Sequence, residues 1–506
     1  MGDPRGFITL RRATPVREPV PTRVRHWGEF YTPLAPEALA DQGARCMDCG
    51  VPFCQGDTGC PVRNVIPEWN DLVHRGRWRE ASEALHATNN FPELTGRLCP
   101  APCESACVLG LIDEPVAIRT IEQAIADRAF AEGWIAPRPP RHERPEHVVV
   151  VGSGPAGLAA AQQLRRGGYR VTVLEQADRI GGLLRYGIPD FKLEKAVLDR
   201  RLAQLVAEGV VFRTGVKLGR DVQLHELRAR YDAVLLATGA QEARELRVPG
   251  RELRGVHVAM ELLEQQNRRL AGDEIPLEEE ITAHGKRVVI IGGGDTGSDC
   301  AGVCHRQGAV SVQQFELNAQ PPQQRSATTP WPLWPMQLRS SHAHEEGCER
   351  DWNVATTELV GERGAVRRLR TVRVTTRRGA DGHAVPTAIA GTERFIDAEL
   401  VLLATGYAAP TDAAMLDASG VARDSRGMVA TDDAHHTSLA HVFAAGDARR
   451  GASLIVWAIR EGRDAAAAID RHLAALATRR SAGAISDPTD SPVRDRPAPA
   501  RARRSR

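Results

Sequence analysis

Two glycine-rich turns, each set between an apolar run and a helix-forming segment, constrain the fold of this chain more than any other feature. The first, GSGPAG at 152–157, follows HVVVV, and the second, GGGDTG at 292–297, follows RVVII. In a dinucleotide-binding βαβ unit, the first glycine makes the turn, the second lets the backbone approach a pyrophosphate, and the third packs the helix on the strand. Two such units predict an α/β chain with two Rossmann-like domains.

The segments that follow the first turn favour FAD as its dinucleotide. Glu175 ends the next strand, VTVLE, at the distance expected for an acid that binds a ribose hydroxyl. Asp447, in VFAAGD, follows another strand and is placed to accept a hydrogen bond from the ribityl chain of a flavin. The residues expected to bind FAD are Gly152, Ser153, Gly154, Pro155, Ala156, Gly157, Glu175, Gln176, Gly182, Leu183, Arg185, Thr238, Gly239, Gly446, Asp447 and Trp457.

The second turn is then expected to bind the nicotinamide dinucleotide. Its residues leave the choice between NADH and NADPH open, because Glu316 suits a free ribose hydroxyl whereas Arg325 is able to pair with a 2′-phosphate. The residues expected at this site are Gly292, Gly293, Gly294, Asp295, Thr296, Gly297, Arg325, Thr405 and Gly406.

Seven of the ten cysteines lie in two groups, CMDCGVPFCQGDTGCP and LCPAPCESAC. Seven thiols are too many for one structural zinc ion and one too few for two all-cysteine zinc sites. A disulfide framework conflicts with the reducing compartment inferred below. Two iron–sulfur clusters remain, and the Cys60–Pro61 pair resembles the last cysteine of a two-cluster ferredoxin run, which ligates the other cluster.

The two clusters are assigned separate ligand sets. The predicted ligands of the first are Cys46, Cys49, Cys54 and Cys107. Those of the second are Cys60, Cys99 and Cys103, with Glu122 or Gln123 as the fourth. Cys300, Cys304 and Cys348 are expected to be ordinary buried thiols.

Composition shifts along the chain predict how it divides. Residues 1–145 form a helical domain with the two cluster sites, and a Pro-rich linker ends it. Residues 146–283 form the first part of an FAD domain, 284–410 the NADPH domain, and 411–478 the second part of the FAD domain. The last segment, 479–506, has little to bury and is expected to be disordered.

Charge and hydropathy exclude several classes of partner. With 66 basic and 64 acidic residues, the chain offers no strong charge for nucleic acid or a membrane surface. The opening MGDPRGFITLRRATPV lacks the apolar core of a secretion signal, and no apolar run is long enough to span a bilayer. We therefore expect a cytoplasmic protein.

Several further motifs are more specific than a nucleotide fold requires. These are MGDPRGF, CMDCGVPFC, IPEWNDLV, RLCPAPCESACVLG, GGLLRYGIPDFKLEK, GGGDTGSDC, and TPWPLWP followed by SSHAHEEG. In them the chain resembles the small (β) subunit family of bacterial glutamate synthase over nearly its whole length, up to about residue 475. Wider relatives are the FAD/NADPH region of dihydropyrimidine dehydrogenase and the flavin subunits of NADPH–ferredoxin oxidoreductases.

The resemblance implies FAD, NADPH and two [4Fe–4S] clusters, with Glu122 at the position of the non-cysteine ligand. It further implies an electron-input subunit in a hetero-oligomer. The large (α) subunit, which has glutaminase and FMN sites, would convert glutamine and 2-oxoglutarate into two glutamates. The small chain alone is then expected to oxidise NADPH with artificial acceptors and to form no glutamate.

Three alternatives use the same residues differently. The same flavoprotein fits another large partner, of the ferredoxin:NADP oxidoreductase or pyrimidine-reductase type. An NADPH-dependent disulfide reductase needs a close cysteine pair beside the flavin, and Cys300 with Cys304 does not form CxxC. A zinc module that only docks partners is the non-enzyme alternative, and the intact glycine turns argue against it.

Overall fold

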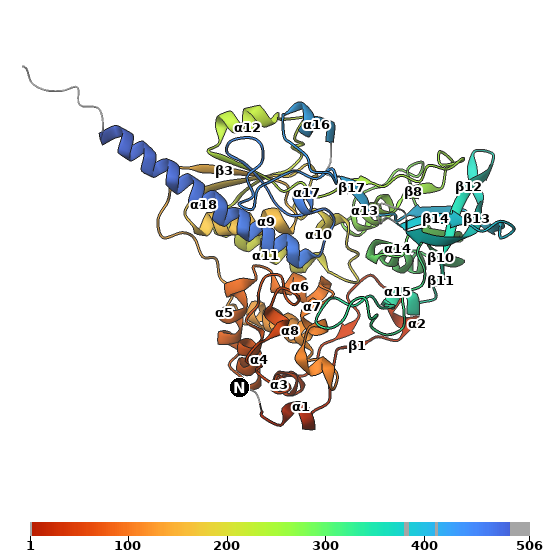
Figure 1. Ribbon diagram of the computed structural model, residues 1–506, viewed down its shortest axis with the longest axis horizontal. Helices are drawn as coiled ribbons and strands as arrows, with labels where there is room; N and C mark the ends of the chain where they lie inside the picture. The colour runs from red at the N-terminus through yellow and green to blue at the C-terminus, as the bar shows by residue number, and fades with distance from the viewer. Residues whose placement is uncertain (1–2, 379–383, 410–412, 486–506) are drawn as a thin grey trace, which may run out of the picture.

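The computed structural model describes residues 3–378, 384–409 and 413–485. A helical region lies below two strand-rich regions that stand side by side, and Figure 1 shows the long helix α18 crossing the upper left of the molecule. Among the described residues, no helix is both long enough and apolar enough to cross a membrane.

The N-terminal region is built from short helices joined by loops. They are α1 (Gly6–Thr9), α2 (Val20–Arg23), α3 (Pro36–Ala44), α4 (Ile66–His74), α5 (Trp78–Thr88), α6 (Pro92–Leu98), α7 (Pro102–Ser105) and α8 (Ile118–Ala131), with 3₁₀ turns at Phe53–Gln55 and Val108–Leu111. Strands β1 (Val16–Arg17) and β2 (Tyr31–Thr32) pair antiparallel. Proline occupies the first turn of α3, α4, α6 and α7, where its missing N–H costs no intrahelical bond. The predicted helical domain is therefore present.

The first sheet has five parallel strands in the order β18-β6-β3-β4-β5. They are β3 (His147–Val151), β4 (Arg170–Leu174), β5 (Val211–Arg213), β6 (Ala233–Leu236) and β18 (Val442–Ala444). The helices of this region are α9 (Pro155–Arg166), α10 (Leu183–Tyr186), α11 (Lys195–Ala207), α12 (Leu224–Arg230), α16 (Ala413–Ala418), α17 (Asp447–Arg450) and α18 (Ile455–Ile485). The central strands are buried on both faces, which explains their unbroken apolar runs.

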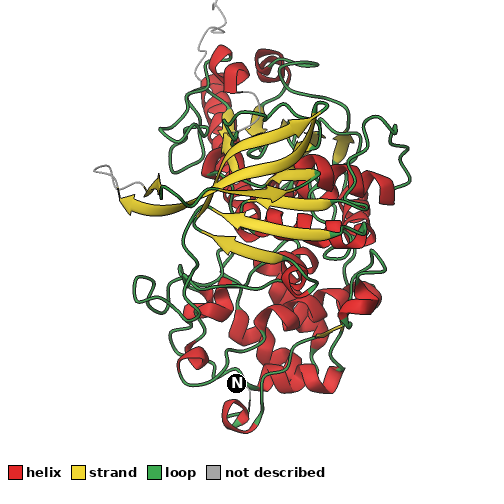
Figure 2. Cartoon of the chain, turned by 90° about the vertical axis from the view of Figure 1, so that its right-hand side faces the viewer, coloured by secondary structure: helices red, strands yellow, loops and turns green. Residues whose placement is uncertain are grey.

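The second sheet repeats this design with the order β11-β10-β9-β16-β8. Its strands are β8 (Val256–Val258), β9 (Arg287–Ile291), β10 (Ser311–Glu316), β11 (Glu349–Trp352) and β16 (Leu400–Leu403), and its helices are α13 (Ala259–Leu270), α14 (Asp295–Arg306) and α15 (His342–Glu345). An antiparallel sheet is added at one side, made of β12 (Val354–Glu362), β13 (Ala365–Arg378), β14 (Ala384–Ala388) and β15 (Arg394–Asp397). The strands of these larger sheets gather in one half of the molecule, above the helical region (Figure 2).

The chain passes from the first sheet to the second and back. It leaves after β6, and its final strand, β18, pairs with β6. The short ladder of β7 (Glu242–Ala243) with β17 (Tyr407–Ala409) joins the two crossing segments. The predicted fold class, a helical domain followed by two interleaved Rossmann-like domains, is confirmed.

Two predicted segment boundaries, at residues 283 and 479, differ from where the observed elements begin and end. Strand β8 lies within the predicted first part of the FAD domain, 146–283, but it pairs with β16 in the second sheet. Helix α18 continues to Ile485, so residues 479–485 of the segment expected to be disordered are helical. The rest of that segment, 486–506, lies outside the described residues.

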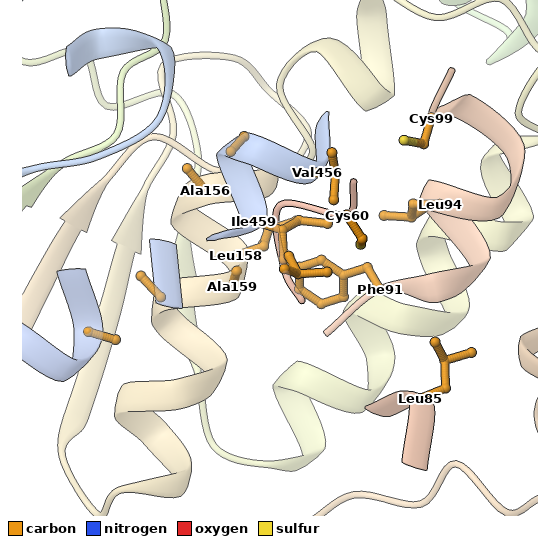
Figure 3. Packing of buried hydrophobic residues seen from close by; sticks show 14 of the residues in the cluster. Cys60, Leu85, Phe91, Leu94, Cys99, Ala156, Leu158, Ala159, Val456 and Ile459 are labelled. Atoms are coloured by element: carbon orange, nitrogen blue, oxygen red, sulfur yellow. The ribbon is translucent and has the colours of Figure 1, made fainter. Parts of the chain in front are cut away.

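The helical region packs directly on the first sheet's helices. Figure 3 shows Phe91, the residue before α6, and Leu94 of α6 on one side of Val456 and Ile459 of α18, with Ala156, Leu158 and Ala159 of α9 on the other. Polar contacts follow the same junction, since Arg463 of α18 donates to the side-chain oxygen of Asn90 at 2.7 Å. One continuous core therefore spans the cysteine-rich region and the first nucleotide fold.

Candidate functional site

The first predicted cysteine set surrounds one cavity. Its lining includes Cys46, Cys49, Cys54 and Cys107, together with apolar side chains such as Phe53 and Leu109. The loop around the first 3₁₀ turn supplies three of the thiols, and the residue before the second 3₁₀ turn supplies the fourth. Burial raises the pKa of Cys46 to about 11, and Cys107 and Cys49 add to the rise.

The second predicted set surrounds a separate cavity. Its lining includes Cys60, Cys99, Cys103 and Glu122, and also Thr95, Arg119 and Val456. Burial raises the pKa of Cys60 to about 12, with the Glu122 carboxylate contributing, and burial raises the pKa of Glu122 itself to about 7. The neighbouring Gln123 instead packs against α6, where a Cβ added to Gly96 would lie 2.7 Å from the Gln123 Cβ. The geometry thus favours Glu122 over Gln123 at this cavity.

The donor sets fit iron–sulfur clusters in number and in kind. No group of three His, Cys, Asp or Glu side chains among residues 3–378, 384–409 and 413–485 is arranged for a single metal ion. Instead, four thiols surround one cavity and three thiols with one carboxylate surround the other. Thiolates are the usual ligands of such clusters. Since burial favours the neutral thiols, cluster binding has to release their protons.

The first glycine turn has the close packing and the open space that a dinucleotide needs. Gly152 has φ of +106°, and a Cβ there would lie 2.3 Å from the Ala237 carbonyl oxygen. A Cβ at Gly154, the N-cap of α9, would meet nothing within 4 Å, and no side chain caps the helix. The space beside Gly154 at the N-terminus of α9 is therefore open, and a phosphate placed there would be stabilised by the helix dipole.

Other residues of the expected FAD set gather around this turn. Glu175 accepts hydrogen bonds from the N–H and the hydroxyl of Ser153, at 3.1 and 2.5 Å, so it holds the turn in place. A Cβ on Gly182 would lie 3.1 Å from the Gly154 Cα, and one on Gly446 would lie 2.7 Å from the Ala156 Cβ. Segments far apart in the sequence thus meet at the start of α9.

The remaining members of the FAD set lie on the surrounding loops. Asp447 accepts a hydrogen bond from the Ser453 hydroxyl at 2.8 Å, and burial raises its pKa to about 6. The Arg450 guanidinium lies over the Trp457 ring, with its central carbon, Cζ, 3.8 Å from the ring centre. Two further members are engaged by protein groups, since Gln176 donates to Gln241 and Arg185 pairs with Asp199. Leu183 is half-exposed at the start of α10. Pro155 and Gly157 lie in the first turn of α9, and Thr238 and Gly239 follow β6.

The second glycine turn repeats the arrangement of the first. A Cβ at Gly294, the N-cap of α14, would also meet nothing within 4 Å. Glu316, at the end of β10, accepts a hydrogen bond from the Gly293 N–H, as Glu175 does from Ser153. Burial raises the pKa of Glu316, and Arg350 of β11 opposes that rise. The other members of the turn, Gly292, Asp295, Thr296 and Gly297, connect β9 to the start of α14.

Arg325 and Thr405 are engaged by protein groups. The Arg325 guanidinium donates to the carbonyl oxygens of Thr329, Leu333 and Ser105, the last at 3.1 Å in the helical region. In the same loop, Trp331 packs on Phe53 of the first cavity, with ring centres 4.8 Å apart. Thr405 donates to the Arg244 carbonyl at 2.6 Å, and Gly406 accepts from the Arg244 N–H at 2.9 Å.

Sequence reasoning missed the polar residues that surround Glu122. Asn64, Asn89 and Thr95 all donate to its carboxylate, and they come from three separate segments. Asn89 and Thr95 lie in the run NNFPELTG between the two cysteine groups. Polar residues inside this otherwise helical region were the one feature of the sequence that pointed to them. Arg350, beside Glu316, was also missed because β11 has no motif of its own.

Two family models match the chain. The pyridine nucleotide-disulphide oxidoreductase model covers residues 146–462, which include both glycine turns and both parallel sheets. The model of dihydropyrimidine dehydrogenase domain II, a 4Fe–4S cluster domain, covers residues 23–134, which include both cavities. The chain is an oxidoreductase with FAD, a nicotinamide dinucleotide and 4Fe–4S clusters as its cofactors.

Relatives and solved structures agree with these matches. The glutamate synthase [NADPH] small chain of Mycobacterium tuberculosis is 57% identical over 94% of this chain and 96% of its own length. The glutamate synthase [NADPH] small chain of Bacillus subtilis is 45% identical over 94% of this chain and 99% of its own length. M. tuberculosis FprA in complex with NADPH shares the fold, with a TM-score of 0.54 at 20% identity over 68% of this chain and 89% of that one. This chain therefore belongs to the family of NADPH-dependent glutamate synthase small chains.

Proposed function

We propose that this chain is the electron-input subunit of a glutamate synthase, which oxidises NADPH and supplies electrons to a large subunit that converts glutamine and 2-oxoglutarate into two glutamates. The observation that supports this most directly is the grouping of seven thiols and one carboxylate around two cavities beside a flavin fold. Identity of 57% to a glutamate synthase small chain favours this partner over a ferredoxin or a pyrimidine-reducing enzyme.

The residues of this chain position the cofactors. The open N-termini of α9 and α14 bind the pyrophosphates of FAD and NADPH through their backbone N–H groups. The lining thiols and Glu122 hold the clusters. When bound, the flavin accepts a hydride from the nicotinamide and gives up single electrons to the clusters. The β7–β17 ladder, with its Thr405–Arg244 hydrogen bond, fixes the two dinucleotide domains relative to each other.

We infer an order for the two clusters from their surroundings. Val456 lines the second cavity and directly precedes Trp457 of the FAD set, and Arg460 of the same helix donates to the Pro61 carbonyl at 3.2 Å. The second cluster thus lies on the flavin side. At the first cavity, Cys46 and Cys49 are only partly buried, which puts the first cluster on the partner side.

We propose that the large subunit, with its glutaminase and FMN sites, docks over the first cavity. Apolar side chains are exposed close to the lining residues there, since Val51 is 71%, Leu111 55% and Ile112 74% exposed. Such side chains would be covered by a partner that docks there. We also propose that the hetero-oligomer works in the cytoplasm, because all ten cysteines are free thiols and such thiols persist in a reducing compartment.

The four units, 1–145, 146–283, 284–410 and 411–478, are proposed as the cluster, FAD, NADPH and returning FAD segments. Because β8 pairs with β16, we propose in addition that residues 256–283, counted above in the FAD unit, pack with the NADPH unit.

The test is co-purification of the full chain with its large subunit under anaerobic conditions. We expect NADPH oxidation that requires both glutamine and 2-oxoglutarate, with two glutamates formed per turnover. The isolated chain is expected to reduce ferricyanide with NADPH and to form no glutamate. Glutamate produced by the isolated chain, or coupled NADPH oxidation that needs neither substrate, would contradict the proposal.

A pair of glycine substitutions tests the two dinucleotide assignments. Gly294→Ala adds a methyl group to open space, so the fold is kept while the approach of the pyrophosphate is blocked. We expect the KM for NADPH to rise roughly 10-fold, equivalent to about 1.4 kcal/mol, with FAD content unchanged. Gly154→Ala, the matched variant, is expected to lower FAD content instead. Equal effects of both variants on both ligands would refute the assignment.

A further inference from the structure

Glu122 is held by one of its two carboxylate oxygens. Oε1 accepts hydrogen bonds from the Thr95 hydroxyl at 2.7 Å, the Asn89 amide at 2.9 Å and the Asn64 amide at 3.5 Å. Oε2 has no hydrogen-bond partner among the residues that the structure describes, although Glu122 is buried and lines the second cavity. The carboxylate therefore has one fully engaged oxygen and one free oxygen.

The orientation of both amide donors is determined by their other hydrogen bonds. The Asn64 Oδ1 accepts from the Thr88 hydroxyl at 2.7 Å, and the Asn89 Oδ1 accepts from the Phe91 N–H at 3.0 Å. An amide oxygen accepts and an amide nitrogen donates, so in both residues the nitrogen faces Glu122. Reversal of the Asn89 amide would lose the bonds to both Glu122 and the Phe91 N–H, and reversal of the Asn64 amide would place its oxygen against the Glu122 carboxylate.

The single proton of the Thr95 hydroxyl points to Glu122. Asn89 donates to the Thr95 oxygen at 2.8 Å, which leaves that oxygen its own proton to give. Its distance to Glu122 Oε1, 2.7 Å, is much shorter than its 3.3 and 3.4 Å distances to the carbonyls of Phe91 and Pro92. Hydrogen bonds to a charged acceptor are the stronger ones, so the carboxylate is the preferred acceptor.

We propose that Asn64, Asn89 and Thr95 are positioning residues that hold Glu122 by Oε1, so that Oε2 alone ligates the second cluster. This inference rests on the proposed function, in which Glu122 is that cluster's fourth ligand. The three residues come from the loop after Cys60, the end of α5 and the middle of α6; Thr95 lines the second cavity, and Asn64 and Asn89 reach Glu122 from beside it. We call them the Glu122 cradle.

The cradle has a consequence for the reduction potential of the cluster. Hydrogen bonds to a ligand draw electron density away from the iron and stabilise the reduced form, which carries more negative charge. Loss of a donor from the cradle makes the carboxylate a stronger electron donor to the iron. The second cluster then becomes harder to reduce, and the first cluster, in its separate cavity, is unaffected.

The test is an anaerobic potentiometric titration of the reconstituted full chain, followed by EPR, with iron and sulfide analysis. Thr95→Val removes the hydroxyl and keeps the side-chain shape. We expect full iron and sulfide content, a second-cluster midpoint potential shifted to lower values, and an unchanged first cluster. Thr95→Ser, which keeps the hydroxyl, is expected to restore the potential. Asn64→Ala removes the longest of the three hydrogen bonds and is expected to give a smaller shift in the same direction.

Two further variants separate this inference from the proposed function. Thr172→Val removes a buried hydroxyl on β4, away from both cavities, and is expected to change neither potential. If Glu122→Ala leaves the iron content and EPR of the second cluster intact, the ligand assignment itself fails. If Glu122→Ala alters that cluster while Thr95→Val and Asn64→Ala leave its potential unchanged, the cradle is refuted and the ligand assignment survives. If Thr95→Val gives no folded protein, Asn64→Ala decides alone.

Discussion

Replacement of Arg201 by methionine is expected to lower the free energy of unfolding by about 3–5 kcal/mol. Arg201 of α11 pairs with Glu93 of α6 through two parallel hydrogen bonds of 2.7 Å, and the two side chains are 1% and 0% exposed. Because the Glu93 side chain is fully buried, the substitution leaves its carboxylate with neither the guanidinium nor water to bind. The pair lies where the cluster-bearing helices meet the first sheet's helices, so the loss is expected in their common unfolding transition.

The measurement is denaturant unfolding of the full chain followed by far-UV circular dichroism. Arg220→Met is the matched control, since Arg220 pairs with Asp221 at the surface and its side chain is 65% exposed. A change within about 0.5 kcal/mol is expected there. Glu93→Gln combined with Arg201→Met removes both charges and is expected to recover part of the stability. An Arg201→Met chain as stable as the control would show that the buried pair contributes little.

Replacement of Cys99 by serine is expected to abolish electron delivery to the large subunit and to spare the flavin half-reaction. A serine hydroxyl is a poor iron ligand, and Cys99 lines the second cavity, whose cluster we place between the flavin and the first cluster. NADPH oxidation that depends on glutamine and 2-oxoglutarate should fall to background in the complex. Ferricyanide reduction by NADPH should persist, because it needs only the flavin.

Cys348→Ser is the control for this loss, because Cys348 is a partly exposed thiol outside both cavities. It should keep both activities. Iron analysis should show fewer iron atoms per chain in Cys99→Ser than in Cys348→Ser. Coupled activity that survives in the Cys99→Ser complex would exclude the second cavity from the electron path.

The fold was predictable where local pattern and tertiary structure agree. Each glycine turn needs only the strand before it and the helix after it, so HVVVV and RVVII identified β3 and β9 from short windows. Strand β8 falls inside the predicted unit 146–283, since its three residues, VHV, contain no sign of the sheet that they join. Its pairing with β16 depends on a contact between distant segments, which no local pattern encodes.

The candidate sites, too, were predictable where local sequence was enough and not where tertiary contacts decide. Thiols are rare enough that their spacing predicted two sets, and the structure gathers each set around one cavity. The choice between Glu122 and Gln123 needed the rotation of α8, since neighbouring residues on a helix point about 100° apart. Arg325 stays a predicted partner of a 2′-phosphate, and the sequence holds no sign of the bond that its guanidinium donates to the Ser105 carbonyl. Loop direction of this kind is set by tertiary contacts.

The return of the chain to its first sheet determines when the cofactor sites can form during synthesis. Strand β18 completes the first sheet beside β6, and Val456 of α18 completes the second cavity, although all its other lining residues belong to the N-terminal region. While the ribosome is still making the nicotinamide domain, the cysteine-rich segment has already emerged but lacks this covering helix. The second cavity and the first sheet are therefore completed only when the last part of the chain has been made, whereas the first cavity is lined by residues 46–118 alone. Until α18 docks, the thiols of Cys60, Cys99 and Cys103 lack this cover, and we expect them to be more open to oxidation than in the folded chain.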